Sequence, residues 1–159
     1  MALPTTDLCD AHPDDLRVLA PLFRDFGGIT AFSGPIVTIK AHEDNVIFRK
    51  ALEEPGAGRV LVVDGGGSLR CAMMGGNMAE LGAKNGWSGV LLNGCVRDVK
   101  DLGATAIGIK ALASNPLKSG KKGEGSRDVA VTFGGITFRP GEMLYSDEDG
   151  VVVSARSLG

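Results

Sequence analysis

The stretch from residue 60 to residue 98 constrains the fold of this chain most, because it predicts a buried strand, a helix and a second buried strand in succession. Residues 60–63 read Val-Leu-Val-Val, a continuous apolar run that is typical of a strand covered on both faces. Residues 90–92, Val-Leu-Leu, predict the second buried strand. This second strand delivers Arg97 and Asp98 at its far end.

The segment between the two strands predicts a helix with a glycine-rich start. Gly75 and Gly76 come first. Asn77 is a good N-cap residue, and Glu80 three residues later can complete a capping box. We expect the helix to end near Gly86, because glycine commonly follows the last helical turn.

In such a unit the start of the helix and the end of the next strand lie at the same edge of the sheet, so residues 75–78 and Arg97-Asp98 are expected to converge. Free N–H groups at the helix start suit an anion that approaches the glycine backbone closely. Arg97 can hold a carboxylate or an enolate oxygen through two hydrogen bonds, and Asp98 is an oxygen ligand for a divalent ion. The pattern predicts a site for a small, chelating anion.

Asp64, which ends the first strand, has two alternative places. If residues 69–74 form a loop, Asp64 joins the converging edge; if they form a short strand that pairs back, it lies at the opposite edge. Because a glycine triplet follows at 65–67, Asp64 can equally be a turn residue.

The pair Arg97-Asp98 also has an alternative interpretation. Without the segments around it, the pair would indicate a surface ion pair more readily than a functional site.

The composition fits one globular domain over residues 1–159, with 43% hydrophobic and 23% charged residues. A net charge of −2 gives no electrostatic footprint for direct nucleic-acid binding. The basic cluster at 118–122 lies in a Gly/Ser/Lys stretch, 118–126, that predicts a mobile, solvated loop. The alternative for this cluster is a contact with RNA or with a partner protein.

Sequence features also indicate where the protein works. No apolar run approaches the ~20 residues of a membrane span, and the N-terminus lacks a signal-peptide pattern. Cys9, Cys71 and Cys95 show no CxxC spacing, so neither a disulfide framework nor a zinc knuckle is expected. These features predict a cytoplasmic protein without membrane contact.

The remaining chain is predicted from its periodicity and its turn residues. Helices are expected at 5–11 and 43–53, and strands at 33–40, 104–111, 129–133, 136–138 and 151–153. Thr5 or Thr6 can cap the first helix. The predicted fold class is α/β, a mixed sandwich with a short parallel core from residue 59 to 111 and an antiparallel C-terminal part.

Short motifs along nearly the whole chain carry a resemblance to a known family. They are TDLCD at 6–10, FGG at 26–28, VVDGGGS at 62–68, FGG at 133–135 and DGV at 149–151. On these motifs the chain resembles the RraA-like family, which includes the regulator of ribonuclease E activity A and class II 4-hydroxy-4-methyl-2-oxoglutarate aldolases. The resemblance implies a β/β/α sandwich of the swivelling-domain type and a homotrimer.

Aldolase-competent members of that family share a glycine, twenty residues, Arg-Asp, two residues and an acid. This chain has the pattern as Gly76, Arg97, Asp98 and Asp101. By resemblance, the catalytic residues are Arg97 and Asp98. Arg97 would bind the substrate and the developing enolate, Asp98 would ligate Mg²⁺ or Mn²⁺, and Asp101 would hold a water on that metal.

The same resemblance assigns substrate binding to the backbone of Gly75, Gly76, Asn77 and Met78. The implied reaction is metal-dependent retro-aldol cleavage of 4-hydroxy-4-methyl-2-oxoglutarate to pyruvate. Decarboxylation of oxaloacetate would pass through the same pyruvate enolate, so it is expected as a second activity. The alternative is a protein that binds and inhibits ribonuclease E without catalysis.

Overall fold

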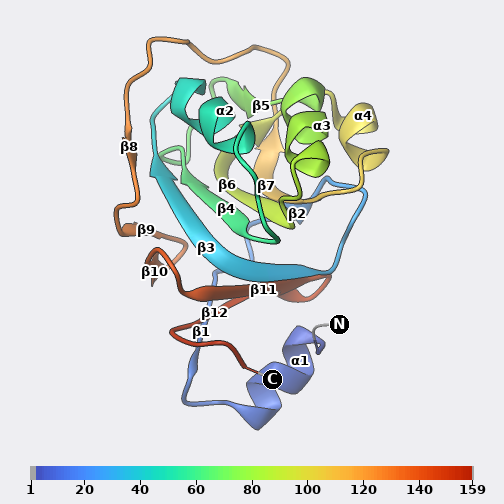
Figure 1. Cartoon of the computed structure of the whole chain (residues 1–159), viewed down its shortest axis with the longest axis vertical. Coiled ribbons are helices and arrows are strands. Elements are labelled where there is room, and N and C mark those ends of the chain that lie inside the picture. The colour runs from blue at the N-terminus through green and yellow to red at the C-terminus, as the bar shows by residue number, and fades with distance from the viewer. Residues whose placement is uncertain (1–2, 159) are drawn as a thin grey trace.

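In the computed structural model, which describes residues 3–158, two layers of strands pack face to face with helices on both outer sides (Figure 1). Helices α2 (Val46–Leu52), α3 (Gly76–Lys84) and α4 (Val99–Gly103) cover one side. Helix α1 (Thr5–Ala11) covers the other side. The predicted mixed α/β sandwich is confirmed.

Strands β4 (Val60–Asp64) and β6 (Gly89–Val96) form the centre of the parallel layer. Strand β3 (Phe32–Lys40) flanks β4, and β7 (Gly108–Ser114) flanks β6, both in parallel. The side chains of residues 60–63 and 90–92 are fully buried. Burial on both faces is why these strands read as continuous apolar runs rather than as alternating patterns.

Strand β5 (Ala72–Met74) decides the place of residues 69–74. It runs parallel to β6 with Ala72 opposite Cys95, and so continues the line of β4 further along β6. Asp64 lies opposite Asn93, two residues before Cys95 along β6. Both arrangements considered from the sequence, a loop and a strand that pairs back, are wrong.

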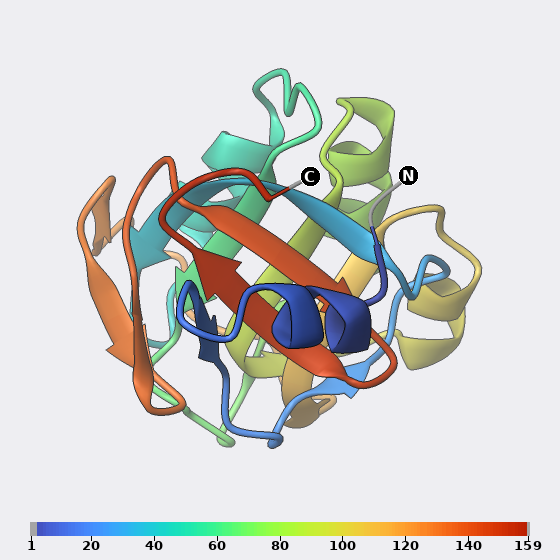
Figure 2. The same ribbon diagram turned by 90° about the horizontal axis from the view of Figure 1, so that it is seen from below.

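Strand β3 belongs to both layers. Its first half pairs with β11 (Met143–Asp147), and its second half pairs with β4 from Ile36 onwards. Strands β12 (Gly150–Ser154) and β1 (Leu16–Val18) complete the antiparallel layer. Figure 2, which is seen from below, shows β11 and β12 crossing in front of the parallel strands, with α1 in front of β11 and β12.

Short strands complete the topology. Strand β2 (Arg24–Asp25) pairs with β7, and β8 (Ser126–Arg127) pairs with β3, both antiparallel. Strands β9 (Val131–Phe133) and β10 (Ile136–Phe138) form a separate antiparallel hairpin, as predicted.

The hydrophobic core is divided by the strand layers. One cluster around Phe48 lies between the parallel layer and helices α2 to α4. A second, around Phe138, fills the space between the two strand layers, and a third, around Leu8, lies under α1. Across residues 3–158, no helix combines the length and the apolar character needed to cross a bilayer.

One helix cap and several element boundaries differ from the sequence predictions. Helix α1 has the predicted residues, but Thr5 lies inside it and donates its N–H (2.8 Å) and hydroxyl (2.7 Å) to the Asp147 carboxylate. Helix α2 starts at Val46 instead of residue 43, because Glu43 has a left-handed φ of 54°. Strand β7 starts at Gly108 instead of residue 104, because α4 and a turn occupy the preceding residues.

Candidate active site

The ends of β5 and β6 lie side by side, and each leads directly into a helix. The Arg97 N–H donates to the Met74 carbonyl at 2.9 Å, which fixes the start of α3 next to the start of α4. Gly75 and Gly76 consequently face Arg97 and Asp98. The structure brings together the two segments that were expected to converge.

Asp98 closes the N-terminus of α3 from outside that helix. Its Oδ2 accepts a hydrogen bond from the Gly76 N–H at 2.9 Å. Its backbone is left-handed, with a φ of 58°, a conformation that aspartate tolerates better than most residues. The N-cap residue is Gly75, and Asn77 lies inside the helix with an exposed side chain, so the predicted Asn77–Glu80 cap is wrong.

The glycines at this junction leave room for the acids of the neighbouring helix. A Cβ atom on Gly75 would lie 2.7 Å from Asp98 Oδ2. One on Gly76 would lie 3.3 Å from the Asp101 Cβ and 3.6 Å from the Asp98 Cβ. The spacing of glycine, Arg-Asp and the second acid is therefore a packing requirement as well as a chemical pattern.

A cavity of about 380 Å³ opens over this junction. The residues predicted to bind substrate or metal all line it: Gly75, Gly76, Asn77, Met78, Arg97 and Asp98. Asp101 does not line the cavity, but its Oδ2 would lie 3.6 Å from a Cβ on Gly76. Asp101 thus lies next to Gly76 but outside the cavity lining.

Backbone and side-chain donors face this cavity. The first backbone hydrogen bond of α3 runs from the Ala79 N–H to the Gly75 carbonyl, so the N–H groups of Asn77 and Met78 have no partner inside the helix. The half-buried Arg97 donates one long bond of 3.4 Å to the Pro116 carbonyl. Most of its guanidinium donors are left for a ligand.

The other wall of the cavity was not predicted from the sequence. Helix α2 contributes Arg49 and Lys50, its C-cap residue is Glu53, and the 118–126 loop contributes Lys118 and Lys121. Positions 49, 50 and 53 share one helical face, which is a weak signal that a solvated helix also gives. Nothing in the sequence connects that face to the two lysines.

Hydrogen bonds tie down the 118–126 loop, for which the sequence predicted a mobile segment. The Ser119 N–H donates to the Ala72 carbonyl at 2.9 Å, and the Gly120 N–H donates to the Glu43 carbonyl at 3.0 Å. Short β-bridges pair Ala72 with Lys118 and Asp44 with Gly120. Both lysines of the cavity are therefore carried on a fixed backbone.

The carboxylate of Asp44 is the main anchor of this loop. Its Oδ2 accepts from the N–H groups of Lys122 (2.7 Å), Gly123 (2.9 Å) and Glu124 (3.3 Å). Its Oδ1 accepts from the Val46 N–H at 3.1 Å, at the start of α2. Desolvation alone would raise the pKa of Asp44, but these backbone donors outweigh it and hold the pKa below its ordinary value.

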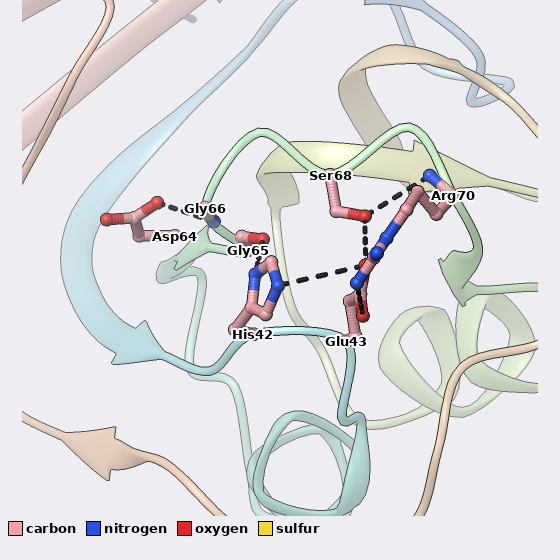
Figure 3. Close-up of polar contacts among 7 residues, drawn as sticks. All are labelled: His42, Glu43, Asp64, Gly65, Gly66, Ser68 and Arg70. Atoms are coloured by element: carbon pink, nitrogen blue, oxygen red, sulfur yellow. Dashed lines mark hydrogen bonds and ion pairs between the residues drawn. The ribbon is translucent and has the colours of Figure 1, made fainter.

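Glu43 ties the glycine-rich loop after β4 to the segment that precedes α2 (Figure 3). Its carboxylate accepts from the Ser68 hydroxyl at 2.7 Å and from two nitrogens of Arg70 at 2.8 and 2.7 Å. The Arg70 hydrogen bonds, with help from Ser68, lower the pKa of Glu43 to about 2. His42 Nε2 lies 3.7 Å from the same carboxylate.

Asp64 is a turn residue, one of the alternatives considered above. Its Oδ1 accepts from the Gly66 N–H at 2.9 Å and from Asn93 Nδ2 at 3.0 Å (Figure 3 draws the first bond). Gly66 has a left-handed φ of 73°, as such a turn requires. Asp64 is not among the residues that line the cavity.

The acids near the cavity fit a water-rich divalent ion better than a closed metal cage. Within residues 3–158, no three His, Cys, Asp or Glu side chains gather as a metal-holding group. Asp98 lines the cavity and uses Oδ2 for the Gly76 N–H, which leaves Oδ1 for a ligand. Mg²⁺ typically keeps several waters and takes one or two carboxylates besides the substrate, which suits this donor set.

Comparison with known sequences gives consistent matches along the whole chain. A family model described as "RraA-like: Aldolase/RraA" matches residues 5–153. A protein of Alkalilimnicola ehrlichii named "Putative 4-hydroxy-4-methyl-2-oxoglutarate aldolase" is 61% identical over 158 residues, which cover 99% of this chain and 98% of that protein. A protein of Aromatoleum aromaticum with the same name is 56% identical, with 99% of each chain covered.

Solved structures with the same fold are described in different functional terms. The "RNA-processing inhibitor RraA from Thermus thermophilis" superposes with a TM-score of 0.96 at 45% identity, covering 100% of this chain and 96% of its own. A Geobacillus kaustophilus structure described as an S-adenosylmethionine: 2-dimethylmenaquinone methyltransferase has a TM-score of 0.96 at 46% identity, covering 98% and 97%. The fold is therefore firmly shared, while the named activities differ.

Proposed function

This chain belongs to the RraA-like family, and we propose that it cleaves 4-hydroxy-4-methyl-2-oxoglutarate by a retro-aldol reaction that needs a divalent metal ion. One cavity carries the proposal, because the start of α3, Arg97 and Asp98 all face it. Relatives of 61% and 56% identity that bear the name of this activity support the choice of substrate.

The start of α3 binds the C1 carboxylate of the substrate. The N–H groups of Asn77 and Met78 are the donors, since neither has an acceptor inside the helix. The positive end of the helix dipole adds to the attraction for an anion. Asp98 already occupies the Gly76 N–H, so the substrate uses the two residues that follow.

Arg97 acts where negative charge develops. Cleavage of the C3–C4 bond leaves its electron pair on C3, and conjugation with the C2 carbonyl moves the charge to oxygen as the pyruvate enolate. The Arg97 guanidinium donates to that oxygen and stabilises it. The C4 hydroxyl loses its proton and becomes the carbonyl of a second pyruvate, and the enolate gains a proton at C3. Loss of CO₂ from oxaloacetate would give the same enolate.

Two acids suit the metal that the family resemblance implies. A bound Mg²⁺ or Mn²⁺ would supply Lewis-acid polarisation of the keto oxygen. Asp98 would hold the ion through the oxygen that Gly76 does not use. Asp101, which lies next to Gly76, would orient a water near Asp98.

The charge of the cavity argues against the methyl transfer named for the Geobacillus structure. S-adenosylmethionine carries a sulfonium cation, and a cationic site repels it. The charged residues that line the cavity are five cations and two acids: Arg49, Lys50, Arg97, Lys118, Lys121, Glu53 and Asp98. An anionic substrate fits this balance better.

Pyruvate release tests the proposal directly. We expect the purified protein to release pyruvate from 4-hydroxy-4-methyl-2-oxoglutarate and from oxaloacetate in an assay coupled to lactate dehydrogenase. EDTA should abolish both activities, and Mg²⁺ or Mn²⁺ should restore them. Release that persists in EDTA would refute metal dependence, and no release from either substrate with metal present would refute the aldolase.

We infer regulation of ribonuclease E as a second candidate function. The supporting observation is the Thermus RNA-processing inhibitor, at 45% identity and a TM-score of 0.96. The test measures ribonuclease E cleavage of an RNA substrate with wild type and with Asp98→Ala. Equal inhibition by both would place the regulatory surface outside the cavity, and no inhibition by wild type would remove this candidate.

A further inference from the structure

The cavity holds more positive charge than the proposed reaction uses. Arg97 serves the enolate, yet Arg49 and Lys50 from α2 and Lys118 and Lys121 from the loop line the same space. The acids of the lining are Asp98, which the metal would neutralise, and Glu53. A cavity with this surplus attracts a ligand that carries a further anionic group.

The loop that carries Lys118 and Lys121 is attached away from the contact between Gly76 and Asp98. The bridge between Ala72 and Lys118 puts the loop beside the first residue of β5. Gly75 follows three residues later, a separation of roughly 10 Å in extended chain. The loop lysines can therefore reach a group on the substrate that lies beyond the carboxylate held at α3.

The loop is also pre-organised for binding. Asp44 accepts the N–H groups of Lys122, Gly123 and Glu124, which directly follow Lys121. On the other side of the lysine pair, the Ser119 N–H is held by β5. Because the backbone is fixed before binding, a ligand orders only the lysine side chains.

Resting on the proposed function, we propose that Lys118, Lys121, Arg49 and Lys50 form a second anion subsite that binds the carboxylate on the C4 side of the scissile bond. The subsite selects 2-oxo acids that carry at least one carboxylate beyond C1. Asp44 is a positioning residue for this subsite, because it holds the loop and touches no substrate atom.

The test compares ligands that differ in distal carboxylates. 4-Carboxy-4-hydroxy-2-oxoadipate has two of them, 4-hydroxy-4-methyl-2-oxoglutarate has one, and pyruvate has none. Pyruvate still reports on the enolate site, because exchange of its methyl hydrogens with deuterium requires the same enolate. The variants are Lys118→Ala, Lys121→Ala and the double substitution, with Lys122→Ala as matched control, since Lys122 is in the same loop but outside the cavity lining.

Replacing either Lys118 or Lys121 by alanine should raise KM for 4-hydroxy-4-methyl-2-oxoglutarate about tenfold, as expected for the loss of one charge-assisted hydrogen bond. The rise should be larger for 4-carboxy-4-hydroxy-2-oxoadipate, and kcat should stay within about twofold, since such a contact binds ground and transition states alike. Pyruvate exchange and the Lys122→Ala control should match wild type. Equal losses in pyruvate exchange and in cleavage would mean that the lysines act at the enolate, and would overturn the subsite. Unchanged KM values would also overturn it.

Calorimetry separates failure of the subsite from failure of the aldolase. Glutarate, butyrate and sulfate are titrated into wild type and the double variant. We expect glutarate to bind more tightly than butyrate, and the difference to vanish in the double variant. If wild type catalyses neither cleavage nor exchange, the proposed function fails. The calorimetric comparison of glutarate with butyrate still tests whether the second anion subsite exists. Equal binding of glutarate and butyrate, or tighter binding of sulfate than of glutarate, overturns it.

Discussion

The two walls of the cavity are built in different ways. The wall that carries Arg97 and Asp98 comes from neighbouring stretches of chain, joined by β5–β6 pairing and by a hydrogen bond from Arg97 to Met74. The wall that carries the lysines comes from α2 and a distant loop, joined by the buried carboxylate of Asp44. The first wall is encoded by residues at short spacing in the sequence, whereas the second is formed only by tertiary contacts. The proposed chemistry lies on the first and the proposed selectivity on the second.

Replacing Asp98 should have the largest effect, because one side chain serves both chemistry and structure. Asp98→Ala removes the proposed metal ligand and the partner of the Gly76 N–H. We expect kcat to fall by about 10³-fold or more, and the free energy of unfolding to fall by about 1 kcal/mol through loss of a helix cap. Steady-state kinetics and thermal denaturation measure the two effects.

Asp98→Asn separates the two roles. Asparagine keeps an acceptor for the Gly76 N–H and also tolerates the left-handed φ of 58°. The Asn variant should therefore unfold near the wild-type temperature while remaining as inactive as the Ala variant. An active Asn variant would show that the carboxylate charge is not needed.

A methyl group at Gly75 should disturb the first wall without removing any charged group. Its Cβ would lie 2.7 Å from Asp98 Oδ2, so the carboxylate must move. We expect Gly75→Ala to lower kcat about 100-fold, in line with the cost of an ångström of misplacement. Gly76→Ala is the milder control, because its Cβ would lie 3.3 Å from its nearest neighbour, the Asp101 Cβ. Equal activities of the two variants would contradict the assigned packing.

The first wall could be predicted from the sequence, because it depends on two strands and on the order of the segments between them. Buried apolar runs at 60–63 and 90–92 fix the two strands, and chain order then forces residues 75–78 and Arg97-Asp98 to one edge. Both inferences use only local pattern and topology. The position of the metal-binding candidate, Asp98, followed from them.

The cap of α3 and the second wall needed information that the sequence does not display. Asn77 has the propensity of an N-cap, but Asp98 reaches the helix start from another element and takes that role. The loop at 118–126 has the composition of a mobile segment, but the Asp44 carboxylate binds three of its N–H groups. In both places a side chain distant in sequence overrides a local preference.

Removing the Asp44 carboxylate should damage the second wall selectively. Asp44→Ala leaves three loop N–H groups and the Val46 N–H without their acceptor, so the loop is expected to detach. KM for 4-hydroxy-4-methyl-2-oxoglutarate should rise about tenfold with little change in kcat, and stability should fall by about 2 kcal/mol. Pyruvate hydrogen exchange should match wild type. Falling exchange would show that Asp44 supports the first wall as well.

The stabilisation by Asp44 should depend on pH in a defined direction. Its pKa is lowered in the folded protein, so its stabilisation is fully present above the unfolded pKa, near 4. It is lost as pH falls through the lower, folded value. The difference in unfolding free energy between wild type and Asp44→Ala should therefore be constant from pH 7 to 5 and shrink below about pH 4. Denaturant titrations at several pH values measure this difference.

Glu43 should have the smallest effect, although its hydrogen bonds are as short as those of Asp44. It joins Ser68 and Arg70 to the segment before α2, but the Arg70 side chain is 78% exposed and water can replace the contact. Glu43→Gln should change KM and kcat by less than about twofold, and Arg70→Gln should give the same result. In wild type, NMR should show Glu43 titrating near pH 2, because its pKa is about 2, with the ion pair intact above that value. A rise in KM as large as that of Lys121→Ala would mean that the loop depends on Glu43 as well as on Asp44, and that the second wall has two anchors.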